Sequence, residues 1–433
     1  MPLPPLAAST LTLEARALLS RLDRVKPFAM IMPRVSAAAV SSEAAMAIDH
    51  HLLQGRRELR RRVQGYLHWL KGPGRNATPE EAQRRFSMLR LRFNAGLTQL
   101  DIFADALTLR AEHENGTWLG GLDVAADDAL ELLAPFFDPP PVVTYLDRGQ
   151  GAAIRRARTR LPGGGENPVA LVRIPRERMV GSGIASSLVH EVGHQGAALL
   201  DLVDSIRHAL RERQGRAQGD EKQAWQLWDR WISEIVADFW ALAKVGIAAT
   251  QGLMAVVSLP RAFVFRIQVD DPHPFPWVRV KLSAATGAAL YPHPQWAAFD
   301  RLWESFYPRA GLDAERLRLI QALEATMPAF VRLLIDHRPK SLRGKRLVEV
   351  FPIPERQPAR LQALFEAWKK SPGEMRSAAP TLVFAVLGQA KQDRKLSPHA
   401  ESETVGDLLN RWALRRALRR PGVPLPTTKA KAA

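Results

Sequence analysis

The chain of 433 residues contains no cysteine, which excludes disulfides and thiolate metal ligands. Any metal site must therefore use histidine and carboxylate side chains. No apolar run reaches the length of a transmembrane helix, because the closest stretch, Val245 to Leu259, contains Thr250 and Gln251. The N-terminus lacks a basic segment followed by an apolar one, so we expect no secretory signal. These absences predict a cytoplasmic protein without a transmembrane segment, and they leave open non-classical export as an effector.

Acidic residues are in the minority, with 44 Asp and Glu against 61 Lys and Arg, for a net charge of +17. From Arg338 to the end, 20 basic residues against 8 acidic ones give +12 of that total. One interpretation is an anionic partner, either nucleic acid or a membrane surface. The other is an arginine-rich composition with a solvated tail, because no nucleic-acid motif accompanies the charge. A second basic cluster is interpreted as one solvated helix face: Arg56, Arg57, Arg60, Arg61 and Arg62.

The pattern of apolar residues predicts an α+β protein that is mainly helical and has a small sheet. We expect three regions. They are a helical N-terminal region (1–138), a central region (139–337), and a basic helical C-terminal region (338–433) whose end, Pro421 to Ala433, is disordered. The break between the first two regions is the proline-rich run that begins at Phe137.

Local signals mark the individual elements. In the first region, helices are expected from Leu11 to Val25, from Glu43 to Lys71, and from the N-cap Thr78 towards Arg110. In the central region, we expect strands at Val142–Leu146 and Pro168–Ile174, helices at Ser182–Leu210, Gln223–Lys244 and Gly246–Leu259, a polar loop at Gln214–Asp220, and an extended segment at Asp270–Trp277.

The run His190-Glu191-Val192-Gly193-His194 is an HExxH motif. On a helix, residues i and i+4 share a face, so both imidazoles can reach one metal ion. Glu191 is placed to hold a water molecule at that ion and to accept its proton. Gly193 permits close approach of another element. The pattern predicts a zinc site whose two histidines are His190 and His194.

A catalytic zinc site usually has three protein ligands. Downstream, Glu234 and Asp238 stand four residues apart in an otherwise apolar sequence, so they share one helix face. Buried carboxylates need partners, and a metal ion with its histidine ligand would satisfy both. We therefore predict Glu234 as the third ligand and Asp238 as the hydrogen-bond partner of His190.

HExxH followed by ExxxD resembles the gluzincin metallopeptidases, the group that includes thermolysin. Asp271-Pro272-His273-Pro274-Phe275-Pro276-Trp277-Val278-Arg279 is similar to the HP-x4-R element of the HtpX and CaaX-prenyl-protease family and its soluble minigluzincin relatives. The resemblance covers roughly residues 165–285. It implies a zincin-like metallopeptidase domain in the central region, with His273 and Arg279 near the active site. The membrane helices of the integral relatives are missing.

The resemblance implies a zinc endopeptidase that hydrolyses a polypeptide substrate, with Glu191 as general base. The oxyanion would be held by zinc together with His273 or Arg279, and Tyr291 and Tyr145 are further candidates. Substrate is expected to add as a strand to an edge formed by Val169 to Ile174. Three alternatives stay open: a DNA-associated protease, an exported effector protease, and a non-catalytic helical interaction protein that retains the domain.

Overall fold

The computed structural model describes residues 2–24, 35–147, 151–161, 165–176, 181, 183–268 and 270–418. The predicted disordered tail, Pro421 to Ala433, lies outside these residues. The chain divides into two compact units. Unit 1 comprises residues 1–117, 140–145 and 155–171, and unit 2 comprises residues 118–139, 146–154 and 172–433. As the sequence predicts, the described structure is mainly helical and has a small sheet.

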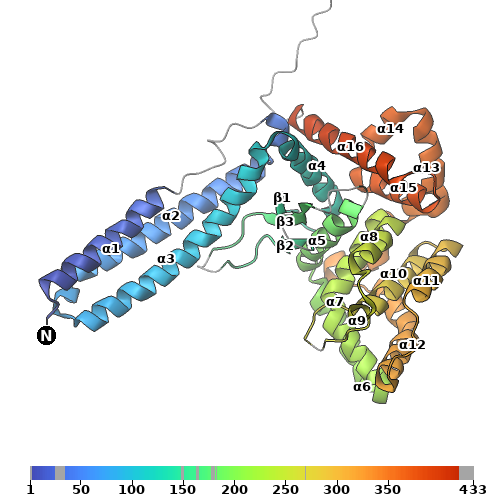
Figure 1. The fold of residues 1–433 in the computed structure, drawn as a ribbon, viewed down its shortest axis with the longest axis horizontal. Coiled ribbons are helices and arrows are strands. Elements are labelled where there is room, and N and C mark those ends of the chain that lie inside the picture. Colours follow the sequence, from blue (N-terminus) through green and yellow to red (C-terminus); the bar gives the residue numbers. More distant parts are fainter. Residues whose placement is uncertain are drawn as a thin grey trace, which may run out of the picture. The chain divides into compact units, whose positions relative to one another are not determined.

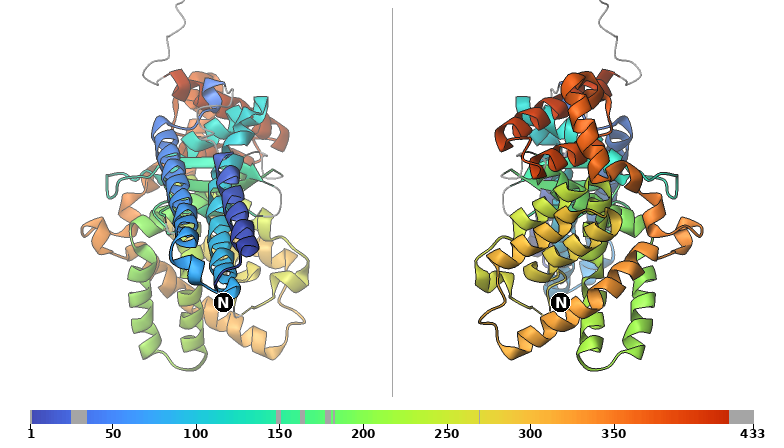
Figure 2. Two further views of the ribbon diagram at one scale, coloured as in Figure 1. Left: turned by 90° about the vertical axis from the view of Figure 1, so that its left-hand side faces the viewer. Right: turned by 90° about the vertical axis from the view of Figure 1, so that its right-hand side faces the viewer.

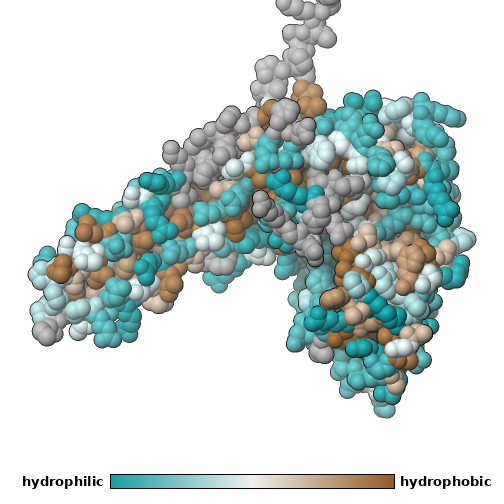
Figure 3. All heavy atoms as spheres, viewed as in Figure 1, coloured by the Kyte–Doolittle hydropathy of each residue, from teal (hydrophilic) through white to brown (hydrophobic). Residues whose placement is uncertain are grey.

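Unit 1 is built on three long helices that lie side by side, α1 (Pro5–Asp23), α2 (Ser42–Lys71) and α3 (Pro79–Thr108) (Figures 1 and 2). The predicted cap of α3 is present, since Thr78 Oγ1 accepts a hydrogen bond from the backbone N–H of Glu81 at 3.2 Å. Apolar side chains at helical spacing fill the space between the helices. On the outside, Figure 3 shows hydrophobic and hydrophilic residues mixed over the three helices.

The sheet has three strands in the order β1-β3-β2, and its residues fall in both units. The strands are β1 (Val142–Asp147), β2 (Ala153–Arg155) and β3 (Ala170–Pro175). The expectation that Val169 to Ile174 forms an open edge is wrong, because β3 lies between the other two strands. The sequence did not indicate β2, which is three residues long and therefore too short for its alternation to be recognised.

Unit 2 places four helices around the predicted site: α5 (Gly183–Leu199), α7 (Gly219–Val245), α8 (Ile247–Val257) and α10 (Pro276–Leu290). The helix α5 packs against α7 and α8, and α10 also packs against α7 and α8. Large aromatic side chains fill the interior of this unit, and seven tryptophans are buried to 2% exposure or less: Trp225, Trp228, Trp231, Trp240, Trp277, Trp296 and Trp303. This packing holds the site helices in one rigid arrangement.

Several helix boundaries differ from the expectation: α1 begins at Pro5 instead of Leu11, and two larger differences lie in unit 2. The helix expected from Ser182 to Leu210 is broken after Leu199, where Asp201 adopts a left-handed conformation with φ of 51°, and it continues as α6 (Leu202–Arg216). The polar loop expected at Gln214–Asp220 is shorter, because α6 extends to Arg216 and α7 begins at Gly219. Polar residues here form solvated helix ends, which composition alone does not distinguish from a loop.

The remaining elements complete the framework. The other α-helices are α4 (His113–Leu130), α9 (Arg261–Val264), α11 (Pro294–Phe306), α12 (Ala314–Asp336), α13 (Pro358–Lys370), α14 (Pro372–Ser377), α15 (Pro380–Gln392) and α16 (Pro398–Leu418). Short 3-10 helices occupy several connections: η2 (Ser36–Ala38), η3 (Pro73–Asn76), η4 (Leu109–Ala111), η6 (Lys340–Leu342), η7 (Leu347–Val350) and η8 (Ile353–Arg356).

Candidate metal centre

Helix α5 carries the HExxH residues into the interior of unit 2. Its apolar residues Ile184, Leu188 and Val192 are buried, which fixes the orientation of the helix. The side chains of His190 and His194 then point the same way, with their ring centroids 4.9 Å apart. They are 15% and 14% exposed, so both rings are largely withdrawn from water but remain accessible from one side.

The close approach of α5 to α7 depends on glycine. A Cβ atom added to Gly193 would lie 2.8 Å from Trp240 Cβ and 3.0 Å from Ala237 Cα. A Cβ atom on Gly196 would lie 2.3 Å from the ring of Trp240. Neither contact is tolerated between packed atoms. The expected close approach at Gly193 is therefore observed, and Ala237 and Trp240 of α7 are the residues that approach it.

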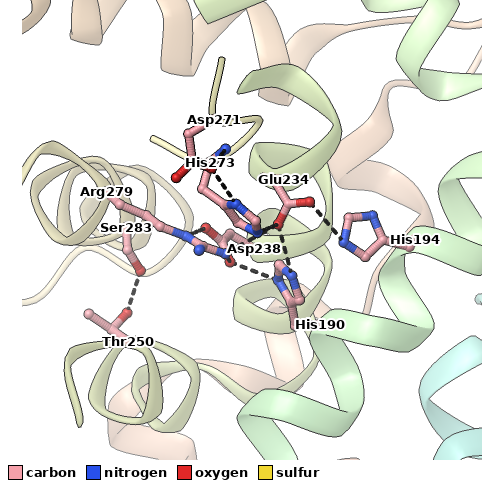
Figure 4. Close-up of polar contacts among 9 residues, drawn as sticks. All are labelled: His190, His194, Glu234, Asp238, Thr250, Asp271, His273, Arg279 and Ser283. Carbon is pink, nitrogen blue, oxygen red and sulfur yellow. Dashed lines mark hydrogen bonds and ion pairs between the residues drawn. The ribbon is translucent and has the colours of Figure 1, made fainter. Parts of the chain in front are cut away.

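Helix α7 presents Glu234 to both histidines (Figure 4). Glu234 Oε2 lies 3.3 Å from His190 Nε2, and Glu234 Oε1 lies 3.4 Å from His194 Nε2. One ligand atom from each of these three residues lies within 4.8 Å of the other two. The tertiary structure thus brings together all three residues that the sequence suggests as metal ligands.

Asp238, one turn after Glu234, lies on the far side of His190. Its Oδ1 atom is 2.8 Å from His190 Nδ1, a short contact that is not aligned as a hydrogen bond. Burial lowers the pKa of His190, but the Asp238 carboxylate and the contact with Glu234 outweigh it and raise the pKa to about 9. The carboxylate thus makes the ring a stronger base, and in metal sites such a partner also orients the ligand.

Arg279 of α10 holds Asp238 from the other side. Its Nε and Nη2 atoms donate to the two Asp238 oxygens at 2.7 and 2.9 Å, and Nη2 lies 3.7 Å from Glu234 Oε2. Burial raises the pKa of Asp238, but Arg279 and then His190 outweigh it and hold that pKa well below its usual range. The sequence indicated Arg279 as a residue near the reaction, whereas the structure assigns two of its nitrogens to Asp238.

The charge and the hydrogen bonds of Glu234 indicate whether these three side chains suit a zinc ion. Its Oε2 atom is buried and has no aligned hydrogen bond among the described residues. Burial raises the pKa of Glu234, but contacts with His190 and His194 outweigh it and bring that pKa far below its usual range, so the group is an anion. This anionic oxygen faces two imidazole nitrogens and has only the more distant Arg279 Nη2, at 3.7 Å, as a cation beside it, so a metal ion would suit it. Two histidines and one glutamate are an established zinc donor set, so the residues fit that metal.

His273 reaches the site from the segment before α10. Its Nδ1 atom lies 2.7 Å from Asp271 Oδ1, and its Nε2 atom lies 3.3 Å from Glu234 Oε2. The Asp271 carboxylate also accepts from the backbone N–H of His273 at 2.9 Å, which fixes the ring relative to the chain. Asp271 opens the sequence run that contains His273, but no role was predicted for it from the sequence. An aspartate two residues before a histidine is the signal that suggests this turn.

A cavity of about 160 Å³ adjoins these residues. Its polar part includes His190, Glu191, His273 and Arg279, and its apolar part comes from α7 and α8: Ala241, Ala249, Leu253 and Val256.

Two further features were not recognised from sequence. Ser283 lines the cavity and its hydroxyl bonds that of buried Thr250 at 2.8 Å, and Gly252 lets α8 approach Ser186 of α5. Serine and threonine in helices carry no local signal for such a role.

Glu191 lines this cavity, and 8% of the residue is exposed. Burial raises its pKa from the ordinary value of a glutamate, against the opposing effect of the two histidines. By contrast, the two tyrosines considered for the oxyanion do not line the cavity. The Tyr291 hydroxyl is buried against the carbonyls of Leu242 and Ala243, and Tyr145 belongs to unit 1.

Comparisons with family models, with curated proteins and with solved structures found no match to this chain. Among the described residues, no helix is both long enough and apolar enough to cross a membrane.

Proposed function

We propose that this chain is a zinc-dependent endopeptidase with a zincin-like domain of the gluzincin type. The observation that carries the proposal is the meeting of His190, His194 and the anionic Glu234 beside a cavity that His190 and Glu191 line. A structural metal site would usually be closed by four protein ligands. Three ligands beside a cavity, with a carboxylate next to them, are the arrangement of a hydrolytic site.

His190, His194 and Glu234 would hold the zinc ion. When bound, zinc supplies Lewis acidity, which makes water more acidic and a peptide carbonyl more electrophilic. Asp238 supports His190 at Nδ1, so the ring presents Nε2 to the site. Arg279 neutralises Asp238 and keeps its two oxygens in place through Nε and Nη2.

Glu191 would act as the proton carrier. Its carboxylate oxygens would accept the proton of the attacking water and later deliver it to the leaving amine. Burial raises its pKa, which brings the group closer to the range in which it both accepts and releases a proton. The apolar residues Leu253 and Val256 on the cavity wall would exclude bulk water and accommodate a substrate side chain.

His273 would contribute from the edge of the site. The ring lines the cavity, with Nδ1 held by Asp271 and Nε2 at 3.3 Å from Glu234 Oε2. A donor in this position would stabilise negative charge on a substrate oxygen. Arg279 would position Asp238, and because it also lines the cavity, its sequence-based role near the reaction stays a prediction.

The decisive experiment compares Glu191→Gln with the unchanged protein. Zinc stoichiometry is measured by mass spectrometry, and cleavage of unfolded casein in H₂¹⁸O is followed by ¹⁸O incorporation at new C-termini. We expect one zinc ion in each protein and a loss of hydrolysis by about 10²- to 10⁴-fold in the variant. The matched control is Glu212→Gln on the exposed surface of α6, which should behave as the unchanged chain.

Two results would overturn the proposal. If Glu191→Gln cleaved at the rate of the unchanged protein, Glu191 would not be the proton carrier. If the unchanged protein bound no zinc, or bound zinc and incorporated no ¹⁸O into any unfolded polypeptide, the site would not be that of an endopeptidase.

A further inference from the structure

Unit 1 carries a feature that the peptidase site does not involve. Two hollows of about 620 and 540 Å³ lie along the faces of α2 and α3, and both are lined in part by Arg62 and Arg92. They therefore adjoin one another. We refer to them together as the arginine groove, because six arginines line it: Arg57, Arg61, Arg62, Arg84, Arg85 and Arg92.

The positive charge of the arginine groove is only partly compensated. Among its described lining residues the one acidic side chain is Glu58, which pairs with Arg61 at 3.0 Å and with Arg62 at 2.8 Å. Glu81, outside the lining, pairs with Arg85. The other three arginines, Arg57, Arg84 and Arg92, are exposed and have no ion pair within the described residues.

Packing does not explain these three arginines. The contact between α2 and α3 is made by buried apolar residues such as Leu59, Phe86 and Phe93, while the three guanidinium groups face water. Like charges gathered on one surface repel one another and contribute nothing to the core. Their concentration in a concave surface is therefore better explained by a ligand of opposite charge.

The charge of the basic C-terminal region, for which the sequence suggested an anionic partner, is also only partly compensated. Within its described part, 6 of its 16 basic residues are ion-paired inside unit 2. These are Arg346 with Asp336, Lys369 and Lys395 with Glu366, Lys391 with Glu401, Arg411 with Asp407, and Arg416 with Asp127. The arginine groove is distinguished by the hollows that its cations line, not by being the only uncompensated charge.

The dimensions of the groove restrict the ligand. From His51 to Trp69 the lining of α2 spans 18 residue steps, which at 1.5 Å per residue is about 27 Å. The two hollows enclose only about 620 and 540 Å³, so they admit part of a single extended strand more readily than a duplex. A concave surface also fits a linear chain better than a flat membrane. A single strand of about four or more nucleotides matches this length.

The aromatic residues of the groove indicate which part of such a strand would be recognised. Arg85 covers one face of Trp69 at 4.3 Å, and the backbone at Gly74 lies so close to the ring that an added Cβ would be 2.9 Å from it. Tyr66 is buried and its hydroxyl donates to the carbonyl of Ala82. Arg85 and the stacked ring of Tyr66 thus both lie against Trp69, so recognition would rest mainly on phosphates, for which arginine offers paired donors.

We propose that the arginine groove binds single-stranded nucleic acid through its phosphates and without base preference. Each guanidinium that neutralises a phosphate releases condensed counterions, so binding weakens as salt concentration rises. This proposal is independent of the peptidase activity, because none of the groove residues belongs to the zinc site.

The test uses the full-length chain and fluorescein-labelled 20-mers of deoxythymidine and of uridine, with affinity measured by fluorescence anisotropy from 50 to 300 mM salt. The variant is Arg57→Gln, Arg84→Gln and Arg92→Gln together. Since each phosphate contact on a single strand contributes about 0.7 to the slope of log K against log salt, the slope should become shallower by about 2. At 0.1 M salt this corresponds to a loss of affinity of about 100-fold.

The matched control removes the same net charge elsewhere in unit 1, by Arg16→Gln, Arg24→Gln and Arg75→Gln, three exposed arginines that do not line the groove. We expect it to retain the affinity of the unchanged protein within a few-fold. Far-ultraviolet circular dichroism and thermal unfolding establish that both triple variants are folded.

Three results would overturn the proposal. Equal weakening in both triple variants would show that net charge alone attracts the strand. Tighter binding of a 20-base-pair duplex, or of a labelled 20-residue polyglutamate, than of either single strand would assign the groove to another anion. Absence of binding to either single strand at 50 mM salt would leave the groove without the proposed ligand.

Discussion

Asp238 offers the sharpest test of how the metal centre is built, because one carboxylate contacts two different partners. It lies 2.8 Å from His190 Nδ1, and it accepts two hydrogen bonds from Arg279, whose side chain is only 12% exposed. Asp238→Asn keeps the shape of the side chain and removes its charge. The substitution should therefore weaken zinc binding and destabilise unit 2 through separate contacts.

The two effects have different expected sizes. Loss of a carboxylate that supports a histidine ligand costs about 10- to 100-fold in metal affinity. Loss of one partner from a buried ion pair costs about 3–5 kcal/mol. Since Glu234 remains 3.7 Å from Arg279 and offers partial compensation, we expect the lower end of that range. Adding Arg279→Gln removes the uncompensated cation, so the double variant should recover stability but not zinc affinity.

Both quantities can be measured on the full-length chain at pH 7.5. Zinc affinity follows from competition with a chromophoric chelator, and stability from urea unfolding monitored by tryptophan fluorescence. Ten of the 11 tryptophans lie in unit 2, since only Trp69 belongs to unit 1, so this signal reports the unit that holds the site. The control is Glu324→Gln, which removes a carboxylate paired with Lys281 and Arg309 away from the cavity and should leave zinc affinity unchanged.

The reasoning fails if Asp238→Asn binds zinc as tightly as the unchanged protein, because Asp238 would then serve Arg279 alone. It fails equally if the unfolding free energy is unchanged, because the pair would then not be an important buried interaction. A double variant less stable than Asp238→Asn would show that Arg279 stabilises unit 2 by contacts other than this carboxylate.

Three further predictions concern packing, pH and metal. Gly193→Ala places a methyl group 2.8 Å from Trp240 Cβ, so α5 must move away from α7. We expect the free energy of unfolding in urea to fall by about 1–3 kcal/mol and zinc binding to weaken. An unchanged zinc affinity would show that the helices tolerate the shift. Burial lowers the pKa of Lys244 to about 8, so the unfolded chain binds more protons above that pH and stability should rise towards pH 10.5 by on the order of 3 kcal/mol. Unfolding at pH 7.5 and pH 10 should show this rise in the unchanged protein and not in Lys244→Met, and equal rises in both would contradict it. Chelation of zinc should lower the free energy of unfolding by about 2.7 kcal/mol, compared with protein at a zinc concentration 100-fold above the Kd. Zinc but not magnesium should restore the stability, because imidazole donors disfavour magnesium. Rescue by magnesium would argue against this donor set.

Some features of the site could be predicted from the sequence, and others could not. The spacing of His190 and His194 and that of Glu234 and Asp238 each place two side chains on one helix face, and both helices are present. The position of β3 in the middle of the sheet could not be predicted, because a strand's own residues do not state how many neighbours it has. The pairing of Arg279 with Asp238 is likewise a contact between residues 41 positions apart, which no local pattern encodes.

The amino-acid sequence by itself determined which side chains share a helix face, because helical periodicity is a local property of the backbone. It determined the HExxH pair, the carboxylate pair and the cap that opens α3. Only the tertiary structure decided which faces meet. The contact of Gly193 with Trp240 sets α5 against α7, and the packing of α2 on α3 gathers arginines from two helices into one groove. These arrangements depend on shape complementarity between distant segments, and that property exists only when the chain is folded.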